Sequence, residues 1–323
     1  MITKRTFLSL CLGLAAGALV APGLGWSSEK LKVGILHSAN EARYLQTAEG
    51  ALKQLKAEGF DDGKISVDTQ SAKGDRATAA KIAKHFVADG AKVILTMGTG
   101  ATGVAVKEVK EIPIVFGMVW DPVDSGFAKD WRSSGTNTTG SSSKVPMIAL
   151  YKTLKQLTPV KRLVVMFCPS EKNSVLQLQE FKDVQKELGI EIIEAPVAKA
   201  EEAAAVARAF ASRGEAIYTS GAVAVTSQMP AITAVLVERK IPTISHLADA
   251  VEAGALIGVT ANIQEGAKFV GAKTAQILRG SQPADLPIET SKRFDIAINL
   301  KTANAMGVKI PINLLQSATK IIR

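Results

Sequence analysis

The sequence predicts an α/β protein made of two doubly wound, parallel-sheet lobes with a ligand cleft between them. Three observations lead to this fold class. Short apolar runs that suit strands alternate with amphipathic runs that suit helices from Leu31 onward. The alternation stops in a Gly-, Ser- and Thr-rich stretch over residues 124–144 and then starts afresh. The 323 residues are also enough for two cores of ordinary size.

The first lobe begins with a strand and is predicted to repeat β-α units. Gly59 can end its first helix, and Asp75 can cap the second. The apolar, partly β-branched run Val93–Met97 suits a strand buried on both faces of a parallel sheet. We expect strands over 31–36, 64–69, 93–97 and 112–119, and helices over 42–58, 75–88 and after Gly103. The polar stretch 124–144 is expected to be linker and loop.

The second half of the chain shows the same alternation. Helices are expected over 146–157, 174–188, 200–211, 223–238 with an interruption near Pro230, 264–278 and 300–306. Strands are expected over 162–167, 190–195, 216–219, 241–245, 256–260 and 294–298. Lobe 1 then comprises residues 28–143 with about 262–290, and lobe 2 comprises 144–261, while 291–323 have no assigned lobe. The expected crossings lie near 117–119, 142 and 260–262.

Residues 1–27 have the pattern of a secretory signal peptide. Lys4 and Arg5 precede an apolar core, and a small-residue segment follows it, so cleavage is expected near Ser27 or Ser28. The apolar run is shorter than the roughly 20 residues of a membrane span. Cys11 follows a leucine and lies early, which disfavours a lipoprotein anchor. We therefore expect an exported, periplasmic protein.

Composition excludes several other classes. Without the leader, Cys168 is the single cysteine, so no intramolecular disulfide is expected. The net charge of +9 is spread through the helices and aromatic residues are few, which favours a solvated surface over a nucleic-acid interface. The three histidines have no partners at metal-binding spacing. We expect a monomer without metal or cofactor.

A glycine-rich turn follows the strand Val93–Met97. Its spacing Gly98-x-Gly100-x-x-Gly103 matches the dinucleotide-binding fingerprint, with Asp121 about 20 residues further on. This match raises an NAD-dependent oxidoreductase as an alternative. The alternative is remote, because the turn lies in the third β-α unit and follows a signal peptide. No Gly-x-Ser-x-Gly pattern supports a hydrolase. We expect no enzyme activity.

Ligands of open α/β sheets bind beyond the carboxyl ends of the strands. The candidate contacts on the first lobe are Ser38, Asn40, Glu41, Gly98, Thr99, Gly100, Ala101, Thr102, Trp120 and Asp121. Those on the second lobe are Glu171, Asn173, Ser174, Ser220, Gly221, His246 and Asp249. Some have a structural alternative: Asp121 and Asp249 as turn or cap residues, Asn173 and Ser174 as helix caps, and His246 as a structural histidine.

The candidate contacts predict the chemistry of the ligand. The N–H groups of residues 99–102, with the hydroxyl of Thr99 or Thr102, can hold a carboxylate. The Trp120 indole can cover an apolar or cationic group. Acids able to pair with an amine are Glu41, Asp121, Glu171 and Asp249. This set favours an amino acid or an amino-acid-like carboxylate, with a simple organic acid second.

An ordered set of motifs resembles a known family. The motifs are Val33–Leu36, Thr96–Thr102, Ile112–Phe116, Asp121–Val123 with Gly126, Asn137–Gly140, Phe167–Ser174 and Gly254–Leu256. They are similar to those of periplasmic solute-binding proteins of bacterial ABC transporters, in the type I group that includes tryptophan- and tyrosine-binding members. The resemblance implies a permease as partner. It also implies ligand contacts from Thr99, Ala101, Thr102, Asn173 and Ser174.

The second-lobe part of the pocket departs from the family pattern. His246 and Leu247 replace a usual Ser-Asp pair, and Asp249 is displaced by two positions. An Asp-Asn pair near Ser220 and an Asp-Tyr pair near Ala261 are missing. The resemblance therefore implies fold and transport role, with ligand closure between the lobes, but not the ligand. A sensory protein that presents its ligand to a membrane receptor is the alternative, because it would have the same fold and cleft.

Overall fold

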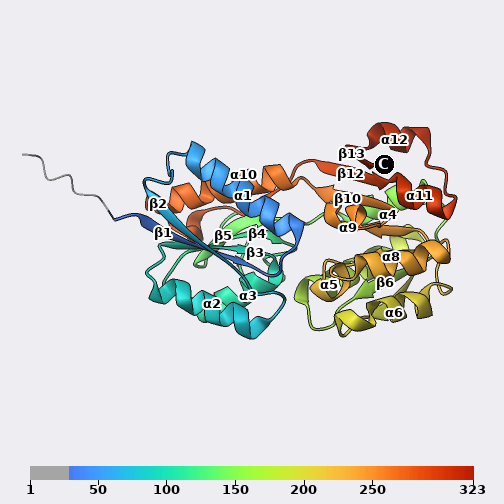
Figure 1. The fold of residues 1–323 in the computed structure, drawn as a ribbon, viewed down its shortest axis with the longest axis horizontal. Helices are drawn as coiled ribbons and strands as arrows, with labels where there is room; N and C mark the ends of the chain where they lie inside the picture. The colour runs from blue at the N-terminus through green and yellow to red at the C-terminus, as the bar shows by residue number, and fades with distance from the viewer. Residues whose placement is uncertain (1–28) are drawn as a thin grey trace, which may run out of the picture.

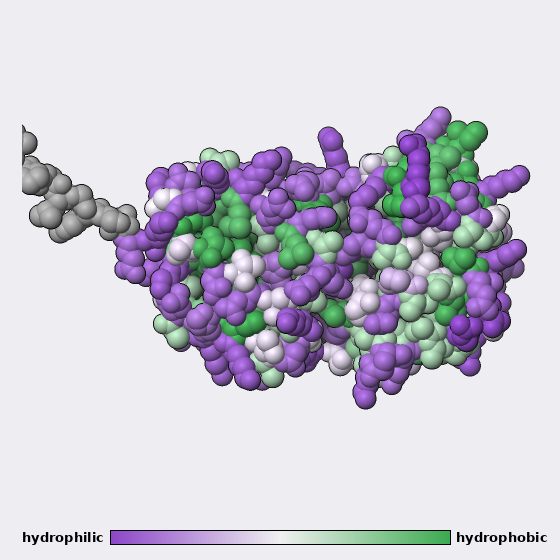
Figure 2. Space-filling model, in the orientation of Figure 1, coloured by the Kyte–Doolittle hydropathy of each residue, from purple (hydrophilic) through white to green (hydrophobic). Residues whose placement is uncertain are grey.

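The computed structural model describes residues 29–323, and the predicted signal peptide lies outside them. Two α/β lobes lie side by side along the long axis of the molecule (Figure 1). This arrangement confirms the predicted fold class. No helix within residues 29–323 is long and apolar enough to span a membrane. Figure 2 shows hydrophilic residues spread over the visible face of both lobes.

The first lobe has a parallel sheet of six strands in the order β11-β5-β4-β3-β1-β2. Helices α1 (Ala42–Ala57) and α10 (Ile263–Leu278) lie on one face, and α2 (Arg76–Ala88) and α3 (Thr99–Glu108) on the other (Figure 1). All five residues of β3 are buried, as expected of an apolar central strand. The strands are β1 (Leu31–His37), β2 (Ile65–Ser71), β3 (Val93–Met97), β4 (Ile114–Val119), β5 (Thr138–Ser142) and β11 (Glu289–Thr290).

The second lobe has seven strands in the order β13-β12-β10-β9-β8-β6-β7. Strand β12 pairs antiparallel with β10, so this sheet is mixed. The strands are β6 (Arg162–Phe167), β7 (Glu191–Pro196), β8 (Ala216–Thr219), β9 (Thr243–Ser245), β10 (Ile257–Ala261), β12 (Phe294–Asn299) and β13 (Lys320–Ile322). Residues 294–299 and 320–322, which the sequence left without a lobe, thus extend the second sheet.

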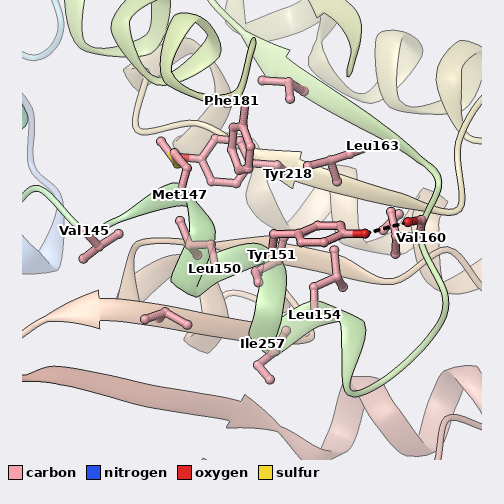
Figure 3. Close-up of a cluster of buried hydrophobic side chains, with 14 of the residues drawn as sticks. Val145, Met147, Leu150, Tyr151, Leu154, Val160, Leu163, Phe181, Tyr218 and Ile257 are labelled. Carbon is pink, nitrogen blue, oxygen red and sulfur yellow. Dashed lines mark hydrogen bonds between the residues drawn. The ribbon is translucent and has the colours of Figure 1, made fainter. Parts of the chain in front are cut away.

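Helices cover both faces of the second sheet and bury an apolar core. In this core, the Phe181 and Tyr218 rings meet edge to face at 4.8 Å, and the Tyr151 hydroxyl donates to the Val160 carbonyl at 2.8 Å (Figure 3). The helices are α4 (Met147–Lys155), α5 (Lys172–Leu188), α6 (Ala203–Phe210), α7 (Val223–Thr226), α8 (Met229–Glu238), α9 (Ala248–Glu252), α11 (Leu300–Met306) and α12 (Ile312–Ser317). Short 3₁₀ turns occupy Ala200–Glu202 and Pro283–Asp285.

The chain passes between the lobes at three places: after β5, after β10 and between β11 and β12. The expectation of a crossing at 117–119 is wrong, because β4 and β5 pair in the first sheet up to Val119 and Ser142. Residues near the end of β4 nevertheless reach the second lobe. Met118, with a φ of 57°, packs against the cores of both lobes.

Two further expectations about the first lobe are wrong. The stretch 124–144 contains β5, whose five residues are all buried although none has a large apolar side chain. Helix α3 begins at Thr99 and not after Gly103, so the glycine-rich turn is itself the first part of a helix. Composition predicted loop in both cases, and the pairing of the sheet overrides it.

Candidate ligand-binding cleft

A cleft of about 1280 Å³ lies between the two lobes. Its walls come from the segments that follow β1, β2 and β3 in the first lobe and β6, β7 and β8 in the second. These strands run parallel within each sheet, so their carboxyl ends open on this one cleft. Of the predicted contacts, the following line it: Ser38, Asn40, Glu41, Thr99, Gly100, Ala101, Glu171, Asn173 and Gly221.

The first-lobe wall is the start of helix α3. Gly98 precedes the helix with a φ of 96°, and a Cβ there would lie 2.7 Å from the hydroxyl oxygens of Ser38 and Tyr44. Ser38 Oγ accepts from the N–H of Ala101 at 2.9 Å. The N–H groups of Thr99 and Gly100 have no hydrogen-bond partner within residues 29–323. They lie at the positive end of the helix dipole, where an anion is stabilised.

Thr102 differs from the expectation that its hydroxyl faces the ligand. The side chain is fully buried and does not line the cleft. Its hydroxyl donates to the Gly98 carbonyl at 2.9 Å, and its N–H also bonds that carbonyl at 3.1 Å. Because the helix begins at Thr99, Thr102 lies in its first turn, where a threonine hydroxyl readily bonds the carbonyl four residues back.

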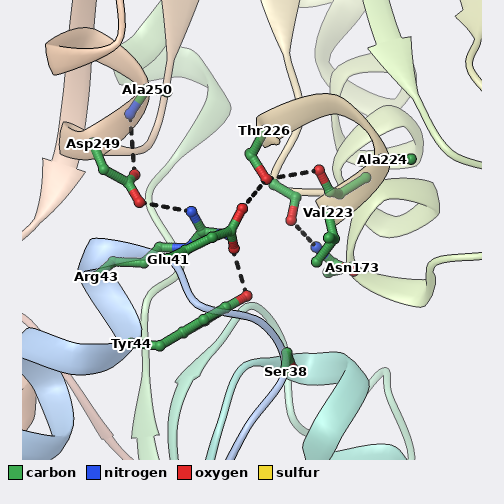
Figure 4. Close-up of polar contacts among 12 residues, drawn as sticks. Ser38, Glu41, Arg43, Tyr44, Asn173, Val223, Ala224, Thr226, Asp249 and Ala250 are labelled. Atoms are coloured by element: carbon green, nitrogen blue, oxygen red, sulfur yellow. Dashed lines mark hydrogen bonds and ion pairs between the residues drawn. The ribbon is translucent and has the colours of Figure 1, made fainter. Parts of the chain in front are cut away.

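A polar network joins the two lobes beside the cleft (Figure 4). Arg43 of α1 donates to Asp249 of α9 at 2.8 Å and also pairs with Glu41. Glu41 in turn accepts from the hydroxyl of Thr226 in α7. The Arg43 side chain is only 3% exposed, so its charge depends on these acids. Asp249 thus serves the lobe contact, and it lines a separate hollow of about 360 Å³ rather than the cleft.

Burial shapes the ionisation of these groups. Burial raises the pKa of Glu41, while the nearby Arg43 guanidinium opposes that shift. Burial disfavours the charge of Arg43, but Tyr44, Asp249 and Glu41 outweigh it and raise the Arg43 pKa. Burial also raises the pKa of Glu171, whose oxygens accept from the N–H groups of Val223 and Ala224 at 2.9 and 3.1 Å. Glu171 therefore caps α7.

Trp120 and Asp121 do not line the cleft, contrary to expectation. Trp120 is 1% exposed and packs in the core of the second lobe, where its indole N–H donates to Glu180 at 2.9 Å. Asp121 accepts from the N–H groups of Val123 and Asp124 and pairs with Lys144 at 2.7 Å. Neither side chain is placed to cover or pair with a ligand in this arrangement of the lobes.

Three second-lobe candidates lie beneath the cleft wall, not on it. The Ser174 hydroxyl accepts from the N–H of Cys168 at 2.7 Å, and the Ser220 hydroxyl donates to Ser174 at 3.4 Å. His246 is 4% exposed, and its ring meets the edge of Trp120 at 4.7 Å. Burial, with a smaller contribution from Arg43, lowers the His246 pKa to about 3, so the imidazole is neutral at ordinary pH.

The sequence reasoning missed several residues of the cleft and its lobe contact. Tyr44 and Phe127 supply aromatic surface, and Arg76 and Lys107 supply positive charge. Phe127 was not predicted as a cleft residue because it lies in the stretch 124–144, which was expected to be linker and loop. Arg43 could have been found only as a basic residue beside Glu41 at a helix start, a common surface pattern. Within residues 29–323, no cluster of three or more side chains is arranged to hold a metal ion.

Two α/β lobes with a ligand cleft at the strand ends define a type I periplasmic-binding-protein fold. The chain belongs to the ABC transporter substrate binding protein family, whose sequence profile matches residues 32–322. Members of this family are solute-binding proteins and not enzymes. The oxidoreductase alternative is therefore discarded, and the glycine spacing has a structural reason: Gly98 forms the turn before α3, and Gly103 packs against Phe127.

Relatives of known structure or ligand cover most of the chain. A tyrosine-binding protein of Clostridioides difficile (strain R20291) is 27% identical over 285 residues, or 88% of this chain and 83% of the relative. A Streptococcus pneumonia ABC domain in complex with L-Trp is 26% identical, covering 91% of this chain and 100% of that one, with a TM-score of 0.87. A ligand-free, open substrate binding protein with adhesive properties from Clostridium difficile is 29% identical, covering 90% and 99%, with a TM-score of 0.70.

Proposed function

We propose that this protein is the exported solute-binding component of an ABC importer and carries an aromatic amino acid, or a similar amino-acid-like carboxylate, to its permease. The observation that carries the proposal is a pair of N–H groups, at Thr99 and Gly100, that have no acceptor among residues 29–323 and lie in a cleft between lobes joined by Arg43 and Asp249. A carboxylate bound there would meet the second lobe across the cleft. A ligand that contacts both lobes favours their closure.

The lobe arrangement supports a closure mechanism. At similar identity, the chain superposes better on the L-Trp complex than on the open, ligand-free relative. The polar contacts from Glu41 and Arg43 to the second lobe need the lobes to be close. The aromatic rings of Tyr44 and Phe127 in the cleft suit an aromatic side chain. A simple organic acid is the second candidate, because the acids at the cleft already bind protein donors.

A thermal-shift screen followed by isothermal titration tests the ligand class. The panel is L-tryptophan, L-tyrosine, other amino acids, organic acids, sugars and nucleosides. A true ligand at 100 times its Kd stabilises the folded protein by about 2.7 kcal/mol. We expect the hits among aromatic amino acids. A sugar or nucleoside as the sole hit would refute the ligand class and leave the family assignment standing.

Localisation and partner need separate measurements. Mass spectrometry of the protein recovered from the periplasm should show an N-terminus near Ser27 or Ser28 and no lipid. Size-exclusion chromatography with light scattering should show a monomer. Crosslinking in cells should capture a permease; capture of a membrane receptor instead would favour the sensory alternative, for which fold and cleft are the same.

A further inference from the structure

A buried polar cluster lies directly behind the second-lobe wall of the cleft. Gln177 of α5, Tyr218 of β8 and His246 after β9 are 1%, 0% and 4% exposed. The Tyr218 hydroxyl lies 2.7 Å from His246 Nδ1 and 3.2 Å from Gln177 Oε1. Gln177 Nε2 lies 3.4 Å from His246 Nε2. The three side chains therefore form a closed ring of contacts, for which the family resemblance predicted no role.

The chemistry of the ring fixes the direction of each hydrogen bond. The N–H of Gly221 donates to Gln177 Oε1 at 2.9 Å, so the amide oxygen of Gln177 must face Gly221 and its NH₂ must face His246. The neutral His246 then accepts at Nε2 and donates from Nδ1 to the Tyr218 oxygen. The Tyr218 hydroxyl is left to donate to Gln177 Oε1. Each member is satisfied only in this arrangement.

The cluster is connected to the cleft surface through Gly221. The Gly221 carbonyl accepts from Asn173 Nδ2 at 2.9 Å. A Cβ at Gly221 would lie 3.0 Å from the His246 ring, so the backbone sits against the cluster. Asn173 lines the cleft, and the hydrogen bond of its side chain within residues 29–323 is made by Nδ2, so its Oδ1 has no partner there. The Gly221 carbonyl thus sets which end of the Asn173 amide is free, and Gln177 holds the Gly221 backbone in place through its N–H.

We propose that Gln177, Tyr218 and His246 are positioning residues that hold Asn173 with its carbonyl oxygen free for a hydrogen-bond donor of the ligand. The inference rests on the proposed function and deepens it. The first lobe offers N–H donors at Thr99 and Gly100, which select an acceptor such as a carboxylate. The second lobe offers an acceptor, which selects a donor such as an ammonium group. The two lobes together discriminate an amino acid from its des-amino analogue.

The test is the ratio of affinities for L-tryptophan and 3-(indol-3-yl)propionate, which lacks the amino group. Loss of folded protein lowers both affinities equally, so the ratio reports positioning and not stability. Wild type should prefer L-tryptophan by at least about tenfold, the effect of one charge-assisted hydrogen bond. Gln177→Met keeps the length of the side chain and removes its hydrogen bonds, and should reduce the ratio about fivefold or more. Asn173→Ala should reduce it as far, and the double variant no further.

Gln179→Met is the matched control, because Gln179 lies on the same helix, is exposed and, among the described residues, hydrogen-bonds through its side chain only to Asp183. Its ratio should equal that of wild type. Tyr218→Phe removes a single hydroxyl and should lower the ratio in the same direction if Gln177→Met folds poorly. A wild-type ratio retained in folded Gln177→Met and Tyr218→Phe would overturn the inference alone. Failure of wild type to bind any amino acid would overturn the proposed ligand class together with it.

Discussion

At the scale of single residues, the first-lobe wall of the cleft offers backbone N–H groups as hydrogen-bond donors to a ligand. Ser38 accepts from the N–H of Ala101, whereas the N–H groups of Thr99 and Gly100 find no acceptor in the part of the chain that the structure describes. Glu41 and Glu171 both line the cleft, but each already binds donors of the protein. The first-lobe wall is therefore a donor surface, and its contribution to affinity can be removed one N–H group at a time.

Thr99→Pro removes one free N–H group and keeps the helix. Proline suits the first helical position, and Gly98 before it has the extended ψ of 151° that proline requires. Since a charge-assisted hydrogen bond contributes roughly 1.5–3 kcal/mol, affinity for a carboxylate ligand should fall about ten- to a hundredfold. Thr99→Val removes only the hydroxyl and should bind more tightly than Thr99→Pro. Isothermal titration giving equal affinity for both variants would contradict this role of the backbone.

At the scale of elements, the packing of α1 on α10 holds the first lobe together across a large distance in sequence. The helices approach so closely that a Cβ at Gly271 of α10 would lie 2.4 Å from the Ala51 carbonyl oxygen of α1. This contact also ties the returning segment after β10 to the start of the chain. Its tightness makes the helix pair sensitive to one added methyl group.

Gly271→Ala should lower the free energy of unfolding by about 1–3 kcal/mol, because the helices must separate to admit the methyl group. Gly266→Ala in the same helix is the control, since its Cβ would meet only the Ser141 hydroxyl at 3.3 Å. Urea denaturation followed by circular dichroism measures both variants. Equal midpoints would mean that the helix pair yields without cost and that its close approach is unimportant.

At the scale of the whole molecule, side chains of the two lobes contact each other directly. Arg43 and Asp249 come from opposite lobes, and Glu41 reaches Thr226 across the same boundary. A charge that loses its partner in a largely buried site is costly, so this contact favours the closed arrangement. In the proposed mechanism the ligand is bound between closed lobes, so any loss of closed population weakens the apparent affinity.

Asp249→Asn should shift the lobes toward opening and increase the radius of gyration measured by small-angle X-ray scattering. Asp249 is 18% exposed, so solvent moderates the effect, and about 1–2 kcal/mol, or a tenfold loss of affinity, is expected. Arg162→Gln is the control, because it breaks the Arg162–Glu215 pair within the second lobe, at 2.8 Å. The same radius for Asp249→Asn, wild type and the control would show that the ion pair does not govern closure.

The alternation of apolar strands and amphipathic helices determined most of the fold. Local periodicity and buried apolar runs specify β-α units, and repeated units require parallel sheets. Strand Thr138–Ser142 was missed because its small polar residues carry no local signal, and its burial comes only from pairing with β4. The strands β12 and β13 likewise belong to the second lobe because of pairing that local sequence does not reveal.

The sequence also determined where the cleft lies, because ligands bind beyond the carboxyl ends of parallel strands. Only the tertiary structure decided which of those residues face it. Trp120 enters the second-lobe core, Thr102 bonds its own helix, and Asp249 pairs with Arg43 of the other lobe. The direction of a side chain depends on partners that folding brings from elsewhere in the chain. Residue type and position at a strand end do not contain that information.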